Sequence, residues 1–194
     1  MEEKQSLTAD YFTAVYDRNE DPWDFETSAY EAAKYAATIA ALPNKQEERV
    51  LEVGCSIGVL TRILAQRCIH LLAIDVSQKA LDIATRRCEH VRNVTFKKAS
   101  FPKELPTEQF NLIMISEVAY YLSASDWRSA IGSLYERLVS GGHIVLVHWL
   151  PEVHDYPQTG DQVHDLFEQL MKDKMKRMFS NRADRYRIDV WAKS

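Results

Sequence analysis

Short apolar runs alternate with amphipathic segments along most of this chain. Five runs lack polar alternation and therefore predict strands buried on both faces, as in a parallel sheet. They lie at about Val50–Val53, Leu71–Ile74, Val94–Phe96, Leu112–Ile115 and Ile144–Val147. A final strand is predicted at Tyr186–Ala192.

The segments between these strands predict helices. Ser28-Ala29-Tyr30-Glu31 has the form of a capping box, so a helix is expected to run from there to about Leu42, before Pro43. Other helices are expected at about Gly58–Gln66, Gln78–Glu89 and Asp126–Leu138, the last after a second box and ending at Gly141-Gly142. The alternation predicts an α/β fold, a doubly wound, mostly parallel sheet with helices on both faces.

Composition fits a single domain comprising residues 1–194. Hydrophobic content of 46% and charged content of 27% are ordinary, and a net charge of −4 gives no reason to expect nucleic-acid binding. No apolar run approaches the length of a membrane span, and the N-terminus is too polar for a signal peptide. Three cysteines without a C-x-x-C pair suggest reduced thiols, so a cytoplasmic protein is expected, as a monomer or weak dimer.

The most informative stretch is RVLEVGCSIGVLT, from Arg49 to Thr61. An apolar strand contains the acid Glu52, and a glycine turn and an apolar helix follow. Gly54 allows a sharp turn, and Gly58 is expected to let the helix start lie close to the strand and a ligand. Asp75, at the end of the next strand, lies 23 residues after Glu52. In an open α/β sheet a carboxylate at this place binds a ribose.

The turn is not a phosphate-binding one. Its pattern is E-x-G-x-x-x-G, with Ser56 where a middle glycine could stand, and no Lys-Ser/Thr pair follows Gly58. An anionic Glu52 would repel a pyrophosphate and suits a cationic ligand. LEVGCSIG resembles the first motif of class I S-adenosylmethionine-dependent methyltransferases, acid-x-Gly-x-Gly-x-Gly. The resemblance implies S-adenosyl-L-methionine as cofactor and S-adenosyl-L-homocysteine as product.

Ligand residues are expected just after each strand, because the carboxyl ends of parallel strands meet at one edge. Ser100 stands where the class I family commonly has an acid that contacts the adenine amino group, and Phe101 is a candidate to cover the adenine. Cys55 is a candidate for ligand contact or for packing under the loop. The full cofactor set predicted after the strands is Glu52, Gly54, Cys55, Ser56, Asp75, Val76, Ser100, Phe101 and Ser116.

A closer resemblance covers about Asp21 to His164. The segments DPWDFETSAYEAAKYAATIAALP, SEVAYYL and HWLPEVHDYPQTGDQVH, with the glycine turn, look like the nodulation-factor (NodS-like) N-methyltransferases. This resemblance implies N-methylation of an amino sugar such as a deacetylated chitooligosaccharide, with Trp23, Tyr30 and Lys34 over the methionine end of the cofactor. It also suggests that residues 1–43 form a helical lid, with residues 44–194 as the sheet core.

An amine acceptor must lose a proton, so a general base is expected. The candidates are His148 after the fifth strand, Glu117 after the fourth, and His164; a hydrogen-bonded core histidine is the alternative for His148. Thr159 or Asp161 could cap a helix whose first turn carries Asp161 and His164. No H-x₃-H or H-E-x-x-H spacing occurs, so no metal is expected.

Aromatic residues gather in the same part of the sequence. Tyr120, Tyr121, Trp149 and Tyr156, with Asp161 for hydroxyl groups, are candidates to bind a sugar; they suit a small aromatic acceptor equally and are also common core residues. The final basic stretch, Lys172–Arg187, has seven Lys/Arg and two Asp and is expected to be a solvated surface helix.

Four functions remain open from the residues. The leading one is an S-adenosylmethionine-dependent methyltransferase acting on nitrogen of a sugar or related small molecule. The others are a small-molecule O- or N-methyltransferase of secondary metabolism, a nucleotide-binding module without catalysis, and a nicotinamide-dependent reductase, which the missing G-x-G-x-x-G disfavours.

Overall fold

The computed structural model describes residues 4–194, and the chain divides into two compact units. Residues from Thr8 to Glu104 form the N-terminal unit. Residues from Leu105 to Ser194, with Lys4–Leu7, form the C-terminal unit. The single domain with a lid at residues 1–43 stays a prediction, and the first three residues of that lid lie outside the described part.

The N-terminal unit contains three parallel strands in the order β3-β2-β1. They are β1 (Glu47–Val53), β2 (Cys68–Asp75) and β3 (Val94–Lys98). Val53 pairs with Ile74, and Asp75 pairs with Lys98, so the three strands end close together. The three predicted strands are present, each somewhat longer than its apolar run. The prediction that all are buried on both faces was wrong for β3, whose residues are half-buried or exposed because it pairs only with β2 among the described strands.

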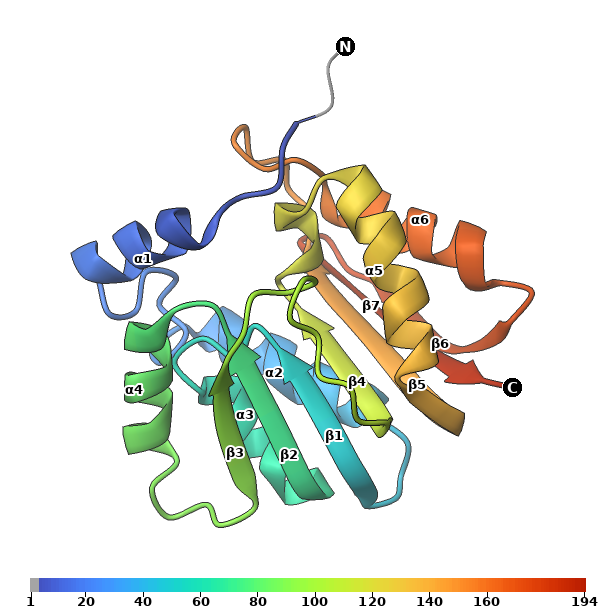
Figure 1. Ribbon diagram of the computed structural model, residues 1–194, viewed down its shortest axis with the longest axis horizontal. Coiled ribbons are helices and arrows are strands. Elements are labelled where there is room, and N and C mark those ends of the chain that lie inside the picture. The colour runs from blue at the N-terminus through green and yellow to red at the C-terminus, as the bar shows by residue number, and fades with distance from the viewer. Residues whose placement is uncertain (1–3) are drawn as a thin grey trace. The chain divides into compact units, whose positions relative to one another are not determined.

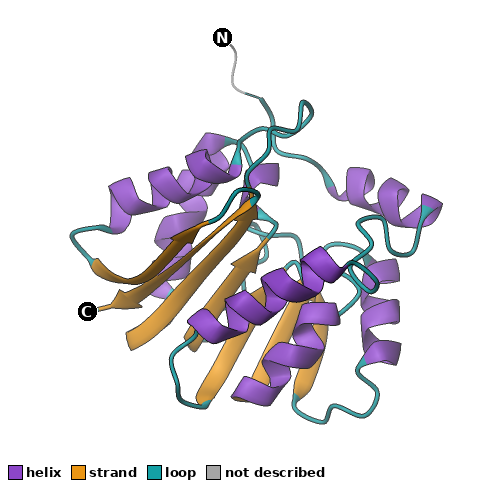
Figure 2. Ribbon diagram, turned by 180° about the vertical axis from the view of Figure 1, so that it is seen from behind, coloured by secondary structure: helices purple, strands orange, loops and turns teal. Residues whose placement is uncertain are grey.

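Four α-helices accompany these strands: α1 (Ala9–Arg18), α2 (Ala29–Ala41), α3 (Val59–Leu64) and α4 (Gln78–Arg87), with a 3₁₀ turn η1 at Ala65–Arg67. Figure 2 shows α2 and α3 lying over one face of this sheet. The Ser28 hydroxyl caps α2 by accepting a hydrogen bond from the Glu31 N–H, as the sequence predicts. Helix α1 was not predicted, because its apolar pattern is weak.

The C-terminal unit contains four strands in the order β4-β5-β7-β6. Strands β4 (Phe110–Ser116) and β5 (Leu138–Trp149) are parallel, whereas β7 (Tyr186–Lys193) is antiparallel to β5, and β6 (Met175–Arg182) is antiparallel to β7. Leu112 to Ile115 of β4 have no exposed surface, which agrees with their uninterrupted apolar sequence.

Helices α5 (Ala124–Glu136) and α6 (Gly160–Met171) belong to this unit, and η2 (Ala119–Tyr121) is a 3₁₀ turn after β4. Figure 1 shows α5 running alongside β5 in front of the sheet. Ser123 caps α5 through the Asp126 N–H, and Thr159, not Asp161, caps α6 in a complete capping box with Gln162. The predicted helix Asp126–Leu138 agrees with α5 to within two residues, but Gly141-Gly142 is not its end signal, because β5 already begins at Leu138.

The basic stretch Lys172–Arg187 is not the predicted surface helix. Its central part, Met175–Arg182, forms β6, which pairs only with β7 among the described strands. Every residue of β6 after Met175 is exposed. Lys and Arg side chains are common on such an edge, where they discourage pairing with another chain. The charge pattern therefore reflects an edge strand, which charge density alone does not distinguish from a helix.

No helix within residues 4–194 is long and apolar enough to cross a membrane.

Candidate functional site

The turn after β1 has three residues in left-handed backbone conformation: Gly54 (φ 75°), Ser56 (φ 50°) and Gly58 (φ 80°). The N–H groups of Gly54 and Cys55 both donate to the Ile74 carbonyl, at 2.8 and 3.0 Å, which ties the turn to the end of β2. A side chain on Gly58 would meet Ala84 Cβ at 2.9 Å. The close approach that Gly58 permits is therefore toward α4, rather than toward the strand.

Ser56 occupies the middle position where the methyltransferase motif has glycine. Its left-handed conformation costs a side-chain-bearing residue roughly 1–2 kcal/mol relative to glycine. The side chain compensates with a hydrogen bond, because its Oγ lies 2.5 Å from the hydroxyl of Tyr16. The serine that replaces the motif's glycine is thus hydrogen-bonded to a tyrosine on α1.

Asp75 is held at the end of β2 by backbone amides. Its Oδ2 accepts from the Ser56 N–H at 2.9 Å, and its Oδ1 accepts from the Ser77 N–H at 2.8 Å. Burial raises the pKa of the carboxyl, while the amides of Ser77, Ser56 and Val76 act to lower it. A carboxylate has about four acceptor positions, so capacity remains for a further donor such as a ribose hydroxyl.

Tyr16 is a candidate site residue that was not predicted from the sequence. It is buried against Ile57 and Ala80, and its ring meets the edge of Trp23 with centroids 5.7 Å apart. Burial, followed by the charge of Asp75, raises the pKa of the phenol, which therefore stays a neutral hydroxyl. Phe12 and Tyr16 are four residues apart on α1, and this short apolar spacing was the available signal.

Glu52 lies beneath the turn and is 2% exposed. Burial, with a contribution from the charge of Asp75, raises its pKa to about 7. Its carboxyl therefore carries only part of a negative charge at neutral pH, and the attraction to a cation expected from the sequence becomes stronger as pH rises. Burial also raises the pKa of the neighbouring Cys55 thiol, which keeps it protonated.

The other predicted cofactor residues of this unit occupy different environments. Trp23 is half-buried and stacks on Phe25, and Lys34 is buried in an ion pair with Glu31 at 2.9 Å. Lys34 Nζ lies 5.5 Å from the Tyr30 ring, which confirms that these two residues share a helix face. Val76 and Phe101 are half-buried, and the Ser100 N–H donates to Glu104 at 2.7 Å. Their roles toward a cofactor stay predictions.

In the C-terminal unit, Glu117 is the carboxylate directly after β4 and Ser116. It has a left-handed backbone (φ 57°). Its Oε2 accepts from the Tyr120 hydroxyl at 2.6 Å and from the Trp149 N–H at 2.9 Å. Two donors on one oxygen fix the orientation of the carboxylate.

Three tyrosines cluster beside Glu117. The rings of Tyr120, Tyr121 and Tyr156 have centroids 4.6 to 5.0 Å apart, and the hydroxyls of Tyr121 and Tyr156 are separated by 3.3 Å. Burial and the charge of Glu117 raise the pKa of Tyr120 well above its ordinary value, so it remains a hydrogen-bond donor. Trp149 is half-buried at the end of β5. The three predicted tyrosines thus lie together, and the Trp149 backbone is joined to Glu117 beside them.

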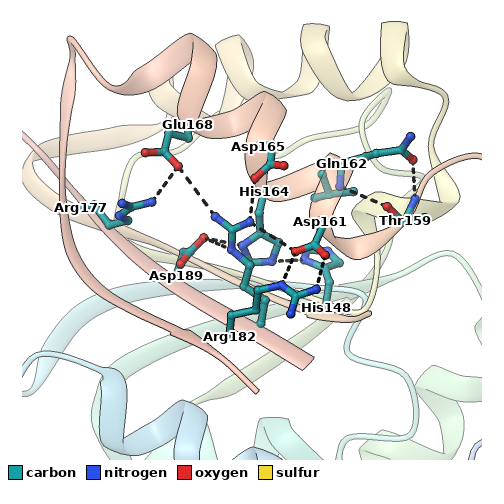
Figure 3. A network of polar contacts seen from close by, with 12 residues as sticks. His148, Thr159, Asp161, Gln162, His164, Asp165, Glu168, Arg177, Arg182 and Asp189 are labelled. Atoms are coloured by element: carbon teal, nitrogen blue, oxygen red, sulfur yellow. Dashed lines mark hydrogen bonds and ion pairs between the residues drawn. The ribbon is translucent and has the colours of Figure 1, made fainter. Parts of the chain in front are cut away.

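His148 and His164 have no exposed surface. His148 Nε2 accepts from the Ala119 N–H at 3.2 Å, and His148 Nδ1 lies 3.1 Å from His164 Nε2. His164 Nδ1 is 2.7 Å from Asp189 Oδ2 (Figure 3). Both ring nitrogens of each histidine are therefore engaged, and neither ring is open to solvent. This is the hydrogen-bonded core environment considered as the alternative for His148.

Asp161 lies on the first turn of α6, as predicted, but it pairs with arginines. Its carboxylate contacts Arg182 Nη2 at 2.7 Å and Arg187 Nη1 at 3.5 Å, and the hydrogen bond from Arg182 lowers its pKa. Among the described residues, no group of three or more His, Cys, Asp or Glu side chains is arranged to hold a metal ion.

Comparison with known proteins adds the family. The sequence profile described as nodulation protein S (NodS) matches residues 10–153. The chain belongs to the NodS family. Nodulation protein S of Rhizobium tropici is 33% identical over 128 residues, which make up 65% of this chain and 54% of that protein. The protein of the same name from Bradyrhizobium diazoefficiens is 32% identical over 121 residues, 61% of this chain and 58% of that one. The chain thus matches somewhat more than half the length of these relatives.

A solved NodS structure shows the fold. The N-methyltransferase NodS from Bradyrhizobium japonicum WM9, crystallised with S-adenosyl-L-homocysteine, has a TM-score of 0.83 at 21% identity, covering 93% of this chain and 97% of that one. The predicted α/β, doubly wound class I methyltransferase fold is therefore confirmed, as is the resemblance to NodS.

Some of the polar site residues lie within the part of the chain that matches NodS, and others lie beyond it. Residues 10–153 include Tyr16, the glycine turn, Asp75, Glu117 and His148. His164 and Asp189 lie beyond it. His164 was predicted from the sequence, whereas its partner Asp189 was not. A carboxylate inside the apolar run of a predicted strand was the signal that could have identified Asp189.

Proposed function

We propose that this NodS-family chain is an S-adenosylmethionine-dependent methyltransferase that transfers a methyl group to the amine of an amino sugar or chitooligosaccharide-like acceptor. The observation that carries the proposal is Asp75, buried at the end of β2 and oriented by the amides of Ser56 and Ser77 beside the left-handed turn. This is the arrangement by which an open α/β sheet binds ribose hydroxyls. Glu52 on β1 carries a partial negative charge near neutral pH, which suits a cationic cofactor better than a pyrophosphate.

When bound, S-adenosylmethionine supplies a methyl group on a positively charged sulfur. The thioether of S-adenosylhomocysteine is a good leaving group. The protein then has to align the acceptor and remove a proton from its amine. Alignment can contribute roughly 7–11 kcal/mol to lowering the barrier. A general base adds about a hundred- to ten-thousandfold in rate.

Glu117 is the base that the geometry supports best. Its carboxylate directly follows β4 and is oriented by hydrogen bonds from the Tyr120 hydroxyl and the Trp149 N–H. His148 was the first candidate from sequence, but its Nε2 already accepts a hydrogen bond from Ala119 and its side chain is fully buried. We therefore place Glu117 first and assign His148 and His164 a supporting role.

The acceptor class rests on the aromatic cluster and on the family. Tyr120 and Tyr121 are buried and form the base of the cluster, whereas Tyr156 is half-buried. Aromatic rings of this kind pack on sugar C–H faces. A small-molecule O- or N-methyltransferase of secondary metabolism is the second candidate, because the same rings suit a small aromatic acceptor. We also propose that the protein is cytoplasmic, since the three cysteines are buried free thiols. A monomer or weak dimer stays a prediction.

Calorimetry and an acceptor screen test the proposal. We expect S-adenosylhomocysteine to bind and NADH not to bind. We also expect S-adenosylhomocysteine release with partly deacetylated chitooligosaccharides. NADH binding alone would indicate a reductase. Cofactor binding without turnover of any amino sugar, phenol or small amine would indicate a binding module, and turnover of phenols alone would select the second candidate.

A further inference from the structure

A chain of hydrogen bonds runs through the interior of the C-terminal unit from the η2 turn to β7. It begins at the Ala119 N–H, passes through His148 and His164, and reaches Asp189. Arg187 Nε completes it with a hydrogen bond to the same Asp189 oxygen at 2.9 Å. His148 lies on β5, His164 on α6, and Asp189 on β7, so the chain links three elements that are distant in sequence (Figure 3).

The groups at the two ends of this hydrogen-bond series determine where the ring protons of both histidines lie. A backbone amide can only donate, so His148 Nε2 must be unprotonated and its proton must lie on Nδ1. His164 Nε2 must then accept from His148 Nδ1, and His164 donates its own Nδ1 proton to the Asp189 carboxylate. Both histidines are thereby neutral with the proton on Nδ1. Each tautomer is determined by the hydrogen bonds on either side.

Protonation of either ring would place two donors opposite each other. The charged groups around His164 are Asp189 and Arg187 on β7 and Asp161 on its own helix, and His148 is the titratable group on β5. Burial lowers the pKa of His164, although the Asp189 carboxylate acts to raise it. For Asp189, burial acts to raise the pKa, but the hydrogen bond from His164 and the charge of Arg187 outweigh it and lower the pKa. The chain thus pairs a neutral histidine with an ionised aspartate.

The inner end of the chain determines what it can do. A backbone amide does not pass protons on, so the chain cannot carry a proton from an acceptor to the surface. It can instead hold the η2 turn in place. Ala119 lies two residues after Glu117, and the next residue, Tyr120, donates to the Glu117 carboxylate and contacts the His148 ring, with centroids 5.3 Å apart.

We propose that His164 and Asp189 are positioning residues, which act through His148 to fix the turn that orients the Glu117 carboxylate. Arg187 secures the outer end, because it also pairs with Asp165 at 2.8 Å on α6. The role toward Glu117 rests on the proposed function, whereas the protonation pattern does not. The two parts can therefore be tested separately.

The first test measures the tautomers in the full chain without any acceptor. Long-range ¹H–¹⁵N NMR of the histidine rings at pH 7.5 is expected to show His148 and His164 neutral, each with its proton on Nδ1, the less common tautomer of free histidine. Two matched variants at His164 then separate polarity from volume. Gln offers an acceptor to His148 and a donor to Asp189, whereas Phe fills the space but offers neither.

In His164→Phe we expect the Ala119 amide to exchange with solvent about tenfold faster or more, and in His164→Gln to stay near the wild-type rate. On the proposed reaction, kcat should fall about ten- to a hundredfold in the Phe variant, recover to within about threefold in the Gln variant, and leave cofactor affinity unchanged in both. Asp165→Asn, which loses a partner of Arg187 outside the chain, is the matched control and should leave the tautomers unchanged.

A proton on Nε2 of either histidine, or a charged ring at pH 7.5, would overturn the proposal whatever the reaction proves to be. Equal activity of the Phe and Gln variants would overturn the positioning role, and so would loss of cofactor affinity in parallel with stability. If no acceptor is ever methylated, the proposed function fails. The histidine tautomers and the Ala119 exchange rates would still show whether the hydrogen bonds from Ala119 to Asp189 are arranged as proposed.

Discussion

The polar centres of the two units are built in different ways. In the N-terminal unit, the backbone provides most of the contacts, with amides of Ser56 and Ser77 on one carboxylate and a turn of left-handed residues. In the C-terminal unit, side chains from β5, α6 and β7 are joined one after another by hydrogen bonds. A centre made by the backbone depends on one short segment, whereas a series of hydrogen-bonded side chains depends on the correct packing of several elements. Substitutions far from the site should therefore disturb the C-terminal centre more than the N-terminal one.

The largest expected effect is that of Glu117→Gln. The amide oxygen of Gln can still accept from Tyr120 and the Trp149 N–H, so the local geometry is kept while the base is lost. The methylation rate should fall about a hundred- to ten-thousandfold, and the remaining activity should rise with pH as more amine loses its proton unaided. Steady-state kinetics between pH 6 and 9 measures this.

Glu136→Gln, an exposed change at the end of α5, is the control. S-adenosylhomocysteine affinity should stay within about twofold in both variants, as a division of roles between the two centres requires. An unchanged rate and pH profile in Glu117→Gln would remove Glu117 from catalysis and return attention to His148.

Asp75→Ala probes the backbone-made centre. Two hydrogen bonds from ribose hydroxyls to a charged acceptor should be lost, at roughly 1.5–3 kcal/mol each with imperfect additivity, so cofactor affinity should fall by about 2–4 kcal/mol. Calorimetry with S-adenosylhomocysteine checks this, with the exposed Asp82→Ala as control. An affinity loss below about threefold would mean that Asp75 only holds the turn.

The same difference explains what could be predicted from the sequence. The positions of Glu52, Gly54, Ser56 and Asp75 around one turn could be predicted, because a turn and its two strands are local and their spacing can be read from the sequence. The chain from His148 to Asp189 spans 42 positions in sequence order, so its partners become apparent only once β7 lies beside β5. No local pattern encodes that pairing.

Two errors have the same cause. The basic stretch was assigned to a helix from its charge, although its exposure comes from being an edge strand, a property of the whole sheet. Gly141-Gly142 was assigned as the end signal of α5, although Leu138 is already committed to β5 by its pairing with Phe110. In both places tertiary pairing decided between two local options.

Glu52 gives a pH-dependent test of the N-terminal unit. Its pKa is raised from an ordinary value of 4.5 to about 7 by burial, so the folded state holds this proton more tightly than the unfolded state does. Stability should therefore be greatest below about pH 4.5 for this group and decrease as pH rises toward 7. The shift corresponds to about 3 kcal/mol.

Glu52→Gln removes that dependence, so the variant should be more stable than wild type at pH 8 and little changed at pH 5. Urea unfolding at both pH values measures the difference. Glu48→Gln, an exposed glutamate on the same strand, should show no such trend. A difference between Glu52→Gln and wild type that is equal at both pH values would show that the carboxyl is not held protonated.

The smallest expected effect concerns the side-chain contact within the backbone-made centre, Ser56 with Tyr16. Ser56→Gly should lose one hydrogen bond but relieve the left-handed strain, so the two effects of about 1 kcal/mol each should nearly cancel. Ser56→Ala loses the bond and keeps the strain, so it should be about 1 kcal/mol less stable than Ser56→Gly.

Tyr16→Phe removes only the hydroxyl. Urea unfolding of the three single variants and of Tyr16→Phe combined with Ser56→Ala gives the coupling, expected at about 0.5–1.5 kcal/mol. Equal stability of the Ala and Gly variants would show that the turn carries no strain at Ser56, and zero coupling would show that α1 is held by apolar packing alone.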